Sequence, residues 1–362
     1  MRKSLLDRLR CPVDLGPLAL GASTVCQDGH IMIGQLHCIA CGAIHPVENG
    51  VPNMIPATSP VVNDVNLEQL QAHTIDRFGF EWRHFRDWGW LTEYPDVPEA
   101  EERFFGGLIE HTSSAFWSKT LFHQDDLYPG LLALDAGCGN GRFTNQAAQM
   151  GAEVVGVELG WGAHSAFDHT LALPKVHIVR GDLLRLPFAR ETFDCVFSIG
   201  VLQHPGNAGA AFDSLVQTLR PGALIVAHVY GRGWFAFEIL DALIRSVTTR
   251  LSTSRQMRFA RTTAAAARWL RGGEWRRKVA YRLVFKFVNL LPTEHHMFDW
   301  WTAPIATHHT MAEVRHWYSR NDLDIVRTNP PVGDRATEAR RYFGHQAITV
   351  LGKRPQAMRG GR

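Results

Sequence analysis

The sequence predicts an α/β protein in which a mostly parallel β-sheet is covered by helices on both faces. Near-continuous apolar segments alternate with helical segments between residues 131 and 230, which is typical of buried parallel strands joined by helical crossovers. A glycine-rich turn follows the first of these segments, and a cluster of cysteines lies ahead of them. The chain therefore divides into a sheet domain and a smaller segment that precedes it.

The first strand is expected at residues 131–134 and is followed at once by Asp135. The chain then passes Gly137, Gly139 and Gly141 before a helix begins. Glycines allow a tight turn and a close approach of the backbone to a ligand, while a helix N-terminus presents free N–H groups. The loop suits a dinucleotide or S-adenosylmethionine, and it lacks the Lys-Ser/Thr ending of a phosphate-cradling loop.

The remaining strands are expected at residues 153–159, 176–180, 193–199, 223–230, 323–328 and 345–352, with a helix at 310–321. The second strand carries Glu158 near its end, an acid placed to accept hydrogen bonds from ribose hydroxyls. In sheets of this kind, ligands bind at the carboxyl ends of the strands. We therefore expect a cofactor site at that edge.

Five motifs follow one another along this sheet: LDAGCGNGRF at 134–143, GVELG at 156–160, GDLLRLPF at 181–188, FDCVFSIGVLQH at 193–204 and LRPGALIVAHVY at 219–230. In these motifs and in their order, the chain resembles the class I S-adenosylmethionine-dependent methyltransferases. The resemblance implies a Rossmann-like seven-stranded sheet whose last strand is antiparallel, and S-adenosylmethionine as the cofactor. It says little about the molecule that receives the methyl group.

The same resemblance implies which residues bind the cofactor. Asp135 and the three glycines would hold the methionine moiety, and Glu158 would bind the ribose. Asp182 would meet the adenine amino group, with Leu183 beside the ring. The full predicted set is Asp135, Gly137, Gly139, Gly141, Glu158, Leu159, Asp182, Leu183 and Gly200.

Methyl transfer requires an enzyme to align the acceptor atom with the methyl group, to exclude water and in some cases to remove a proton. His204 lies just past the fourth strand and is the first candidate for a base or an orienting group. Tyr230 ends the fifth strand and faces the same edge, as does His228 if side chains alternate. His308 and His309 precede the last helix and are placed to close over the site.

A second cluster of candidate ligands lies early in the chain, and its members are Cys11, Asp14, Cys26, Cys38 and Cys41. Cys-x-x-Cys-Gly at 38–42 is a common zinc-binding turn. With CPVDLGPL and LHCIACGAIHPVENGVPNMIP, the segment resembles the zinc-ribbon domain of the Trm112-like family, which usually has a cysteine in place of Asp14. Either Asp14 or Cys26 completes the site, or the ribbon folds without metal. A bound zinc ion would be structural, because so small a domain has too little apolar core to be stable without a metal or a disulfide.

Two helical segments frame the sheet. The linker before it is rich in aromatic residues, of which Trp82 and Phe85 are candidates for a lid over the cofactor. The insertion after the fifth strand has helical patches at 234–251, 256–270 and 275–291. Within it, residues 245–286 contain twelve basic residues and one acid, which can attract an anionic partner such as RNA. The basic run could instead form a solvated face on lid helices or contact a membrane surface.

The expected divisions are a zinc-ribbon-like domain at 1–58, a helical linker at 59–130, the cofactor-binding core at 131–230, a basic helical insertion at 231–300, the completion of the sheet at 301–353 and a disordered tail at 354–362. The first residues lack the apolar core of a signal peptide, and no uncharged apolar run reaches bilayer length. Six cysteines in 362 residues do not make a disulfide scaffold. We therefore expect a cytoplasmic protein without a transmembrane segment.

Taken together, these features predict an S-adenosylmethionine-dependent methyltransferase of a small-molecule acceptor in specialised metabolism, anionic if the basic insertion recognises it. A rival hypothesis is an RNA methyltransferase, since a zinc ribbon ahead of this fold also resembles rRNA guanine methyltransferases. Against it, the fourth strand leads into Ser198-Ile199-Gly200 and not into an Asn-Pro-Pro-Tyr motif. The chain could also cyclise S-adenosylmethionine, move its aminocarboxypropyl group, or act as a non-catalytic partner protein. The acceptor atom and the oligomeric state stay open.

Overall fold

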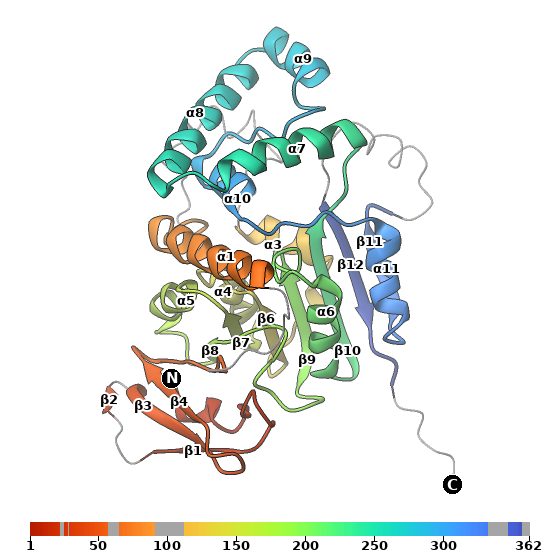
Figure 1. Cartoon of the computed structure of the whole chain (residues 1–362). Coiled ribbons are helices and arrows are strands. Elements are labelled where there is room, and N and C mark those ends of the chain that lie inside the picture. Colours follow the sequence, from red (N-terminus) through yellow and green to blue (C-terminus); the bar gives the residue numbers. More distant parts are fainter. Residues whose placement is uncertain (22–24, 28, 57–64, 91–111, 332–346, 357–362) are drawn as a thin grey trace.

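The computed structural model describes residues 1–21, 25–27, 29–56, 65–90, 112–331 and 347–356. A central sheet carries helices on both faces, a small antiparallel sheet lies at one end of the molecule, and a group of helices lies at the other (Figure 1). The expected fold class is therefore confirmed. Of the tail expected to be disordered, residues 357–362 lie outside the described residues, as do 59–64 and 91–111 of the expected linker.

The central sheet has the strand order β11-β12-β10-β9-β6-β7-β8. Its strands are β6 (Leu132–Ala136), β7 (Glu153–Glu158), β8 (Val176–Arg180), β9 (Phe193–Ile199), β10 (Leu219–Tyr230), β11 (Asp324–Asn329) and β12 (Ala347–Lys353). β12 runs antiparallel to β10 and β11, whereas the other neighbouring strands are parallel. The chain order reverses between β6 and β9, and ligands of open α/β sheets bind at such a switch point.

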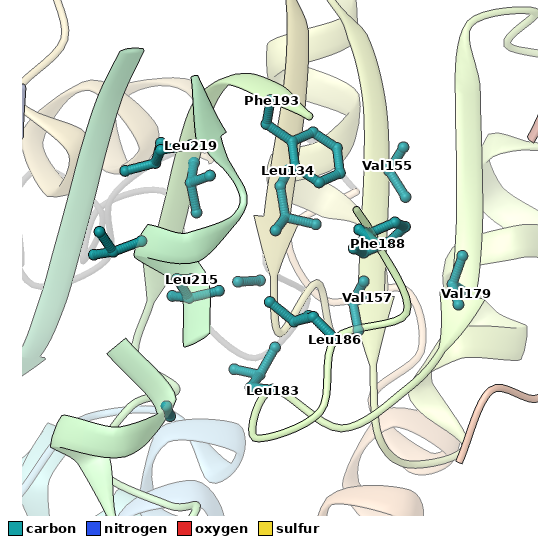
Figure 2. Packing of buried hydrophobic residues seen from close by; sticks show 14 of the residues in the cluster. Leu134, Val155, Val157, Val179, Leu183, Leu186, Phe188, Phe193, Leu215 and Leu219 are labelled. Atoms are coloured by element: carbon teal, nitrogen blue, oxygen red, sulfur yellow. The ribbon is translucent and has the colours of Figure 1, made fainter. Parts of the chain in front are cut away.

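Side chains that alternate along the strands build a core on each face of the sheet. Every residue of β6 is buried, with Leu132 and Leu134 in one core and Ala133 in the other. Figure 2 shows Leu134 beside Phe193 and near Val155 of the neighbouring strand. Each large apolar side chain buried in this way contributes about 1.5–3 kcal/mol. The sheet therefore gives the loops at its edge a rigid support.

The helices that flank the sheet divide between these two cores. α3 (Thr112–Thr120) and α4 (Arg142–Gln149) pack on the Ala133 face through Phe116 and Phe143. α6 (Ala208–Gln217) and α11 (Met311–Ser319) cover the other face through Phe212 and Trp317. α5 (Gly162–Thr170) packs against β7 and β8. Two short 3-10 helices, η1 (Lys3–Leu5) and η2 (Gln124–Asp126), complete this part of the fold.

The small N-terminal sheet is built from β1 (Leu18–Leu20), β2 (Val25–Gln27), β3 (His30–Cys38), β4 (Ile44–Glu48) and β5 (Val51–Pro52). β3 is its centre, because it pairs with β1, β2 and β4. The sheet docks onto the edge of the central sheet, where the Met54 N–H donates to the Arg180 carbonyl at 2.7 Å. Leu5 and Leu9 enter the same apolar core as the central strands. The ribbon therefore packs as an extension of the sheet domain.

Among the described residues, the remaining helices are α1 (Val65–His84), α7 (Phe235–Thr248), α8 (Thr253–Arg271), α9 (Glu274–Leu283) and α10 (Glu294–Thr302). The helix expected at 275–291 was too long, and α10 was not expected. α9 ends before a run of aromatic and β-branched residues, which have low helix propensity. α10 begins after Pro292, where the Thr293 side chain accepts a hydrogen bond from the His296 N–H and caps the helix. None of the described helices is long and apolar enough to span a bilayer.

Candidate functional site

A cavity of about 730 Å³ lies at the carboxyl ends of the central strands, bounded on its other side by residues of α1 and α10. The predicted cofactor residues that line it are Gly137, Gly139, Glu158, Leu159, Asp182, Leu183 and Gly200. The three candidate catalytic residues, His204, His228 and Tyr230, line the same cavity. The fold thus brings both predicted groups together. Asp135 and Gly141 do not line the cavity and lie behind its glycine loop.

The glycine loop needs glycine at two of its positions for steric reasons. Gly137 has φ +87° and Gly139 has φ +55°, a left-handed conformation that favours glycine. A Cβ atom on Gly137 would lie 2.3 Å from the Val201 side chain, and one on Gly139 would lie 2.9 Å from Trp82. The loop is therefore packed tightly between the end of β9 and helix α1, with its backbone facing the cavity.

Asp135 and Glu158 hold this loop in place through their carboxylates. Asp135 accepts a hydrogen bond from the Thr144 hydroxyl at 2.6 Å, which ties the strand end to α4. Glu158 accepts hydrogen bonds from the Gly139 N–H at 3.1 Å and from the Gly160 N–H at 2.9 Å. Burial raises the pKa of Asp135 to about 7 and also raises that of Glu158. Their predicted contacts with methionine and ribose stay predictions.

Asp182 lines the cavity from the turn after β8. Its Oδ1 atom accepts a hydrogen bond from the Leu184 N–H at 2.9 Å, and burial raises its pKa. Leu183 is buried beside it. A carboxyl group next to an apolar side chain can pair with the amino group and the face of an adenine ring. The arrangement agrees with the predicted adenine contact, which stays a prediction.

His204 lines the cavity in a defined protonation state. Its Nδ1 lies 2.6 Å from the Ile305 carbonyl oxygen, so Nδ1 carries the proton and donates it. Nε2 then bears a lone pair and has no hydrogen-bond partner among the described residues. Burial lowers the pKa of His204 to about 4. The side chain therefore offers the cavity a hydrogen-bond acceptor.

The other two candidate catalytic residues are already engaged by neighbours. The Tyr230 hydroxyl donates to Asp299 Oδ2 at 3.0 Å, and burial raises its pKa well above the ordinary value. His228 Nδ1 lies 2.7 Å from the Thr349 hydroxyl of β12, and burial lowers the pKa of His228 to about 3. Tyr230 therefore forms a polar pair with Asp299 at the cavity, whereas the His228 ring is held by a strand of the central sheet.

Sequence reasoning missed several cavity residues on the helical side, which are Glu81, His295, His296, Asp299 and Trp300. Glu81 of α1 is 2% exposed, and its Oε1 lies 3.0 Å from His295 Nε2. The angles do not suit a hydrogen bond, and both atoms lack a hydrogen-bond partner among the described residues. An acid in the middle of an aromatic-rich helix was the signal that could have identified Glu81.

The two lid candidates occupy different places. Trp82 lines the cavity and packs against Gly139 of the loop. Phe85 lies outside the lining and packs against His295 and Phe298, with ring centroids 5.2 and 6.2 Å apart. His308 and His309, which were placed by sequence to close over the site, are also absent from the lining that the structure describes; His308 Nδ1 lies 2.7 Å from Glu238 Oε2.

The basic part of the insertion, residues 245–286, does not line the cavity. No residue from 231 to 288, a fully described range, is among the lining residues. Arg245 is buried and donates to the carbonyls of Trp300 and Ala303, while Arg271 donates to the Leu290 carbonyl at 2.8 Å. These two arginines therefore stabilise the helical layer itself.

The small sheet brings together four of the five candidate metal ligands. The ligand atoms of Cys11, Asp14, Cys38 and Cys41 all lie within 4.8 Å of one another. Cys11 Sγ and Cys41 Sγ are 3.7 Å apart, and Cys38 Sγ is 3.4 Å from Asp14 Oδ1. Cys26 is exposed on β2 and lies outside this group. Its place on the strand paired with the first half of β3 carries it away from the turns that hold the other ligands.

Residues 134–227 match the protein family described as "Methyltransferase domain". The chain is 31% identical over 118 residues to the ubiquinone biosynthesis O-methyltransferase of Bradyrhizobium sp. (strain ORS 278), a match that covers 30% of this chain and 44% of that protein. It is 32% identical over 177 residues to the tRNA U34 carboxymethyltransferase of Azotobacter vinelandii (strain DJ / ATCC BAA-1303), covering 46% of this chain and 52% of that one. The chain thus spans about half the length, or less, of these curated relatives.

Solved structures resemble the chain over a longer stretch at low identity. Geranyl diphosphate C-methyltransferase from Streptomyces coelicolor A3(2) aligns with 82% of this chain and 100% of its own, at 14% identity and a TM-score of 0.47. A chain from the complex of the Haloferax volcanii Trm112 methyltransferase activator with a methyltransferase also covers 82% of this chain and 100% of its own, at 14% identity and a TM-score of 0.42.

Proposed function

We propose that this chain, which contains a class I S-adenosylmethionine-dependent methyltransferase domain, transfers a methyl group to a small molecule held in the cavity beneath α1 and α10. The observation that carries the proposal is the continuity of this cavity. Gly137, Glu158 and Asp182 line it together with His204 and Tyr230. Cofactor and acceptor would therefore meet without crossing a protein wall.

The cavity residues of the glycine loop and of the strand ends fit S-adenosylmethionine. A Cβ atom on Gly137 would overlap Val201, so the loop leaves its backbone open to the ligand. Asp135 and the glycines would hold the methionine moiety, Glu158 the ribose, and Asp182 the adenine amino group. Leu159, Leu183 and Gly200 would complete the cofactor pocket. When bound, the cofactor supplies a methyl group on a positively charged sulfur.

A second group of cavity residues, which includes His204 and Tyr230, would position the acceptor. His204 Nε2 presents a lone pair that can accept a hydrogen bond from the acceptor. Tyr230 is held by Asp299 and would form a polar wall, with His228 behind it. Trp82 and Trp300 add aromatic surface that excludes water. Alignment and water exclusion of this kind account for much of the rate enhancement in a group transfer.

A small molecule is favoured over RNA as the acceptor. The names of the relatives include both ubiquinone biosynthesis and tRNA modification, so they allow either class. The twelve basic residues at 245–286 would have to guide RNA to the site, yet none of them lines the cavity. The same fact removes the reason to expect an anionic small molecule.

The N-terminal sheet would bind one structural zinc ion through Cys11, Asp14, Cys38 and Cys41. Tetrahedral zinc with sulfur ligands at 2.3 Å requires sulfur atoms about 3.7 Å apart, and Cys11 Sγ and Cys41 Sγ have this separation. This geometry favours Asp14 over Cys26 as the fourth ligand.

The proposal is tested by incubating the full chain with S-adenosylmethionine alone, with the small-molecule fraction of a cell extract and with the RNA fraction. We expect mass spectrometry to detect S-adenosylhomocysteine with the small-molecule fraction. Activity only with RNA, abolished by ribonuclease, would make it an RNA methyltransferase. Methylthioadenosine formed without an acceptor would identify intramolecular cofactor chemistry, and failure to bind the cofactor would indicate a non-catalytic partner protein.

A further inference from the structure

We propose that Glu81 receives the proton of the acceptor, and that the methylated atom is an oxygen or a nitrogen that carries hydrogen. The inference rests on the proposed function and names the chemical class of its acceptor, which is a hydroxyl or amine compound. It excludes carbon and sulfur acceptors, because a C–H group does not donate an ordinary hydrogen bond and an S–H group is only a weak donor. The first evidence is the unusual position of the Glu81 side chain.

Glu81 is a buried carboxyl group whose close neighbour, His295, is not a hydrogen-bond partner. Its side chain is buried and lines the cavity, and Oε1 has no hydrogen-bond partner among the described residues. A buried acceptor left unpaired destabilises the folded state unless a ligand pairs with it. His295 Nε2 lies 3.0 Å away but is misaligned. A ligand group that donates a hydrogen bond would satisfy the carboxylate.

A second unpaired acceptor, His204 Nε2, lines the same cavity. Two acceptors call for a ligand with hydrogen-bond donors, which hydroxyl and amine groups supply. Trp82 and Trp300 line the cavity together with them, so the ligand would also contact aromatic rings. This combination of few polar groups and aromatic walls is typical of small-molecule sites.

Glu81 is a better proton acceptor than His204. Burial raises the pKa of Glu81 to about 8, with Arg142 lowering it and Glu158 raising it by smaller amounts. Burial lowers the pKa of His204 to about 4. His295 and Asp299 of α10 also face Glu81; burial lowers the pKa of His295 to about 3 and raises that of Asp299 to about 7. A base with a pKa near the working pH is the most effective one, so His204 would orient the acceptor.

The proposed step is balanced. A lone pair on the acceptor oxygen or nitrogen forms a bond to the methyl carbon, while the bond between that carbon and sulfur breaks and its electron pair stays on sulfur. The hydrogen of the acceptor atom passes as a proton to the Glu81 carboxylate. Products are the methylated acceptor, S-adenosylhomocysteine and a protonated Glu81, which returns its proton to water when the products leave.

The test compares wild type with Glu81→Gln, Glu81→Asp and a matched control, Asp241→Asn. Asp241 is also a buried acid of the helical layer, where it accepts a hydrogen bond from Trp300 Nε1 at 2.9 Å, but it is not a cavity residue. The substrate is the small-molecule extract fraction, and the cofactor carries a deuterated methyl group. S-adenosylhomocysteine release is measured as a function of pH, together with cofactor binding and melting temperature.

For wild type and Asp241→Asn, we expect kcat/KM to rise with pH and to level off above about pH 8. Glu81→Gln should lose this dependence and about 10²–10⁴-fold in kcat, with cofactor binding retained, and Glu81→Asp should recover part of the rate. The label should be found on oxygen or nitrogen.

A deuterated methyl group on carbon or sulfur would overturn the inference. So would a Glu81→Gln variant with the wild-type rate and pH profile, or one in which cofactor binding and rate fall together. These results leave the proposed function intact, because wild type would still release S-adenosylhomocysteine. The absence of that product with wild type would instead refute the proposed function.

Discussion

At the scale of single residues, the glycine loop requires glycine both for its backbone conformation and because neighbouring side chains leave no room for a Cβ atom. Replacing Gly137 by Ala would combine a φ of +87° with a Cβ contact of 2.3 Å to Val201. We expect a loss of about 1–3 kcal/mol in the free energy of unfolding and a loss of S-adenosylmethionine binding. Thermal unfolding and calorimetric titration measure the two effects.

Gly130 provides the matched control for this substitution. It also has a positive φ, +92°, but nothing lies within 4 Å of an added Cβ. Gly130→Ala should therefore show the conformational cost alone and bind the cofactor as wild type does. Equal effects of the two variants on cofactor binding would contradict the role given to the Val201 contact.

Glu81 should also leave a signature in the stability of the ligand-free protein. Burial raises its pKa from 4.5 to about 8, so its contribution to stability is fully present below about pH 4.5 and is lost as pH rises through about 8. The melting temperature of Glu81→Gln relative to wild type should therefore increase between about pH 5 and pH 8. A difference in melting temperature between the two proteins that does not change over this pH range would show that the pKa of Glu81 is not raised.

Sequence reasoning identified the cavity residues that follow the strands far better than those that lie on the helices opposite. Gly137, Glu158 and Asp182 stand in short motifs directly after strands, where the sheet itself fixes their position. Glu81 and Asp299 lie more than two hundred residues apart on helices that meet only through tertiary packing. No local pattern reports such a meeting, so these two residues needed the three-dimensional structure.

At the scale of secondary-structure elements, periodicity predicted the strands well and the insertion less well. Every expected strand of the central sheet is present, and most of them are buried apolar runs, whereas β11 is largely exposed. Helix α10 was missed because its residues mix histidine, acid and tryptophan without a helical stripe, and six of its nine residues are buried. The apolar pattern at 284–291 suggested a helix. These residues instead form a connecting segment that packs against the apolar core of the C-terminal helices.

The ribbon element carries its own prediction. Purified protein should contain one equivalent of zinc by elemental analysis, and Cys38→Ser should lose it, because Cys38 is one of the four clustered residues. Cys26→Ser should keep the metal, since Cys26 lies outside the cluster. The melting temperature should fall on chelation, because the ribbon shares an apolar core with the central sheet. Zinc lost in Cys26→Ser but kept in Cys38→Ser would contradict this assignment.

At the scale of the whole molecule, the cavity lies between the central sheet and the helices α1 and α10. The central sheet presents the glycine loop and the acids, while α1 and α10 supply the opposite wall. The ribbon docks at the sheet edge near β8, and α7, α8 and α9 lie at the opposite end of the molecule (Figure 1). The strongly basic character of the insertion was visible in the sequence, but only the fold shows that the basic residues at 245–286 do not line the cavity.

A crystal structure of the full chain with S-adenosylhomocysteine would test most directly whether one cavity holds both cofactor and acceptor. We expect adenine beside Asp182 and Leu183, the ribose at Glu158, and the sulfur directed toward Glu81, His204 and Tyr230. Electron density for the ligand outside this cavity, or with its sulfur facing away from these three residues, would contradict the claim.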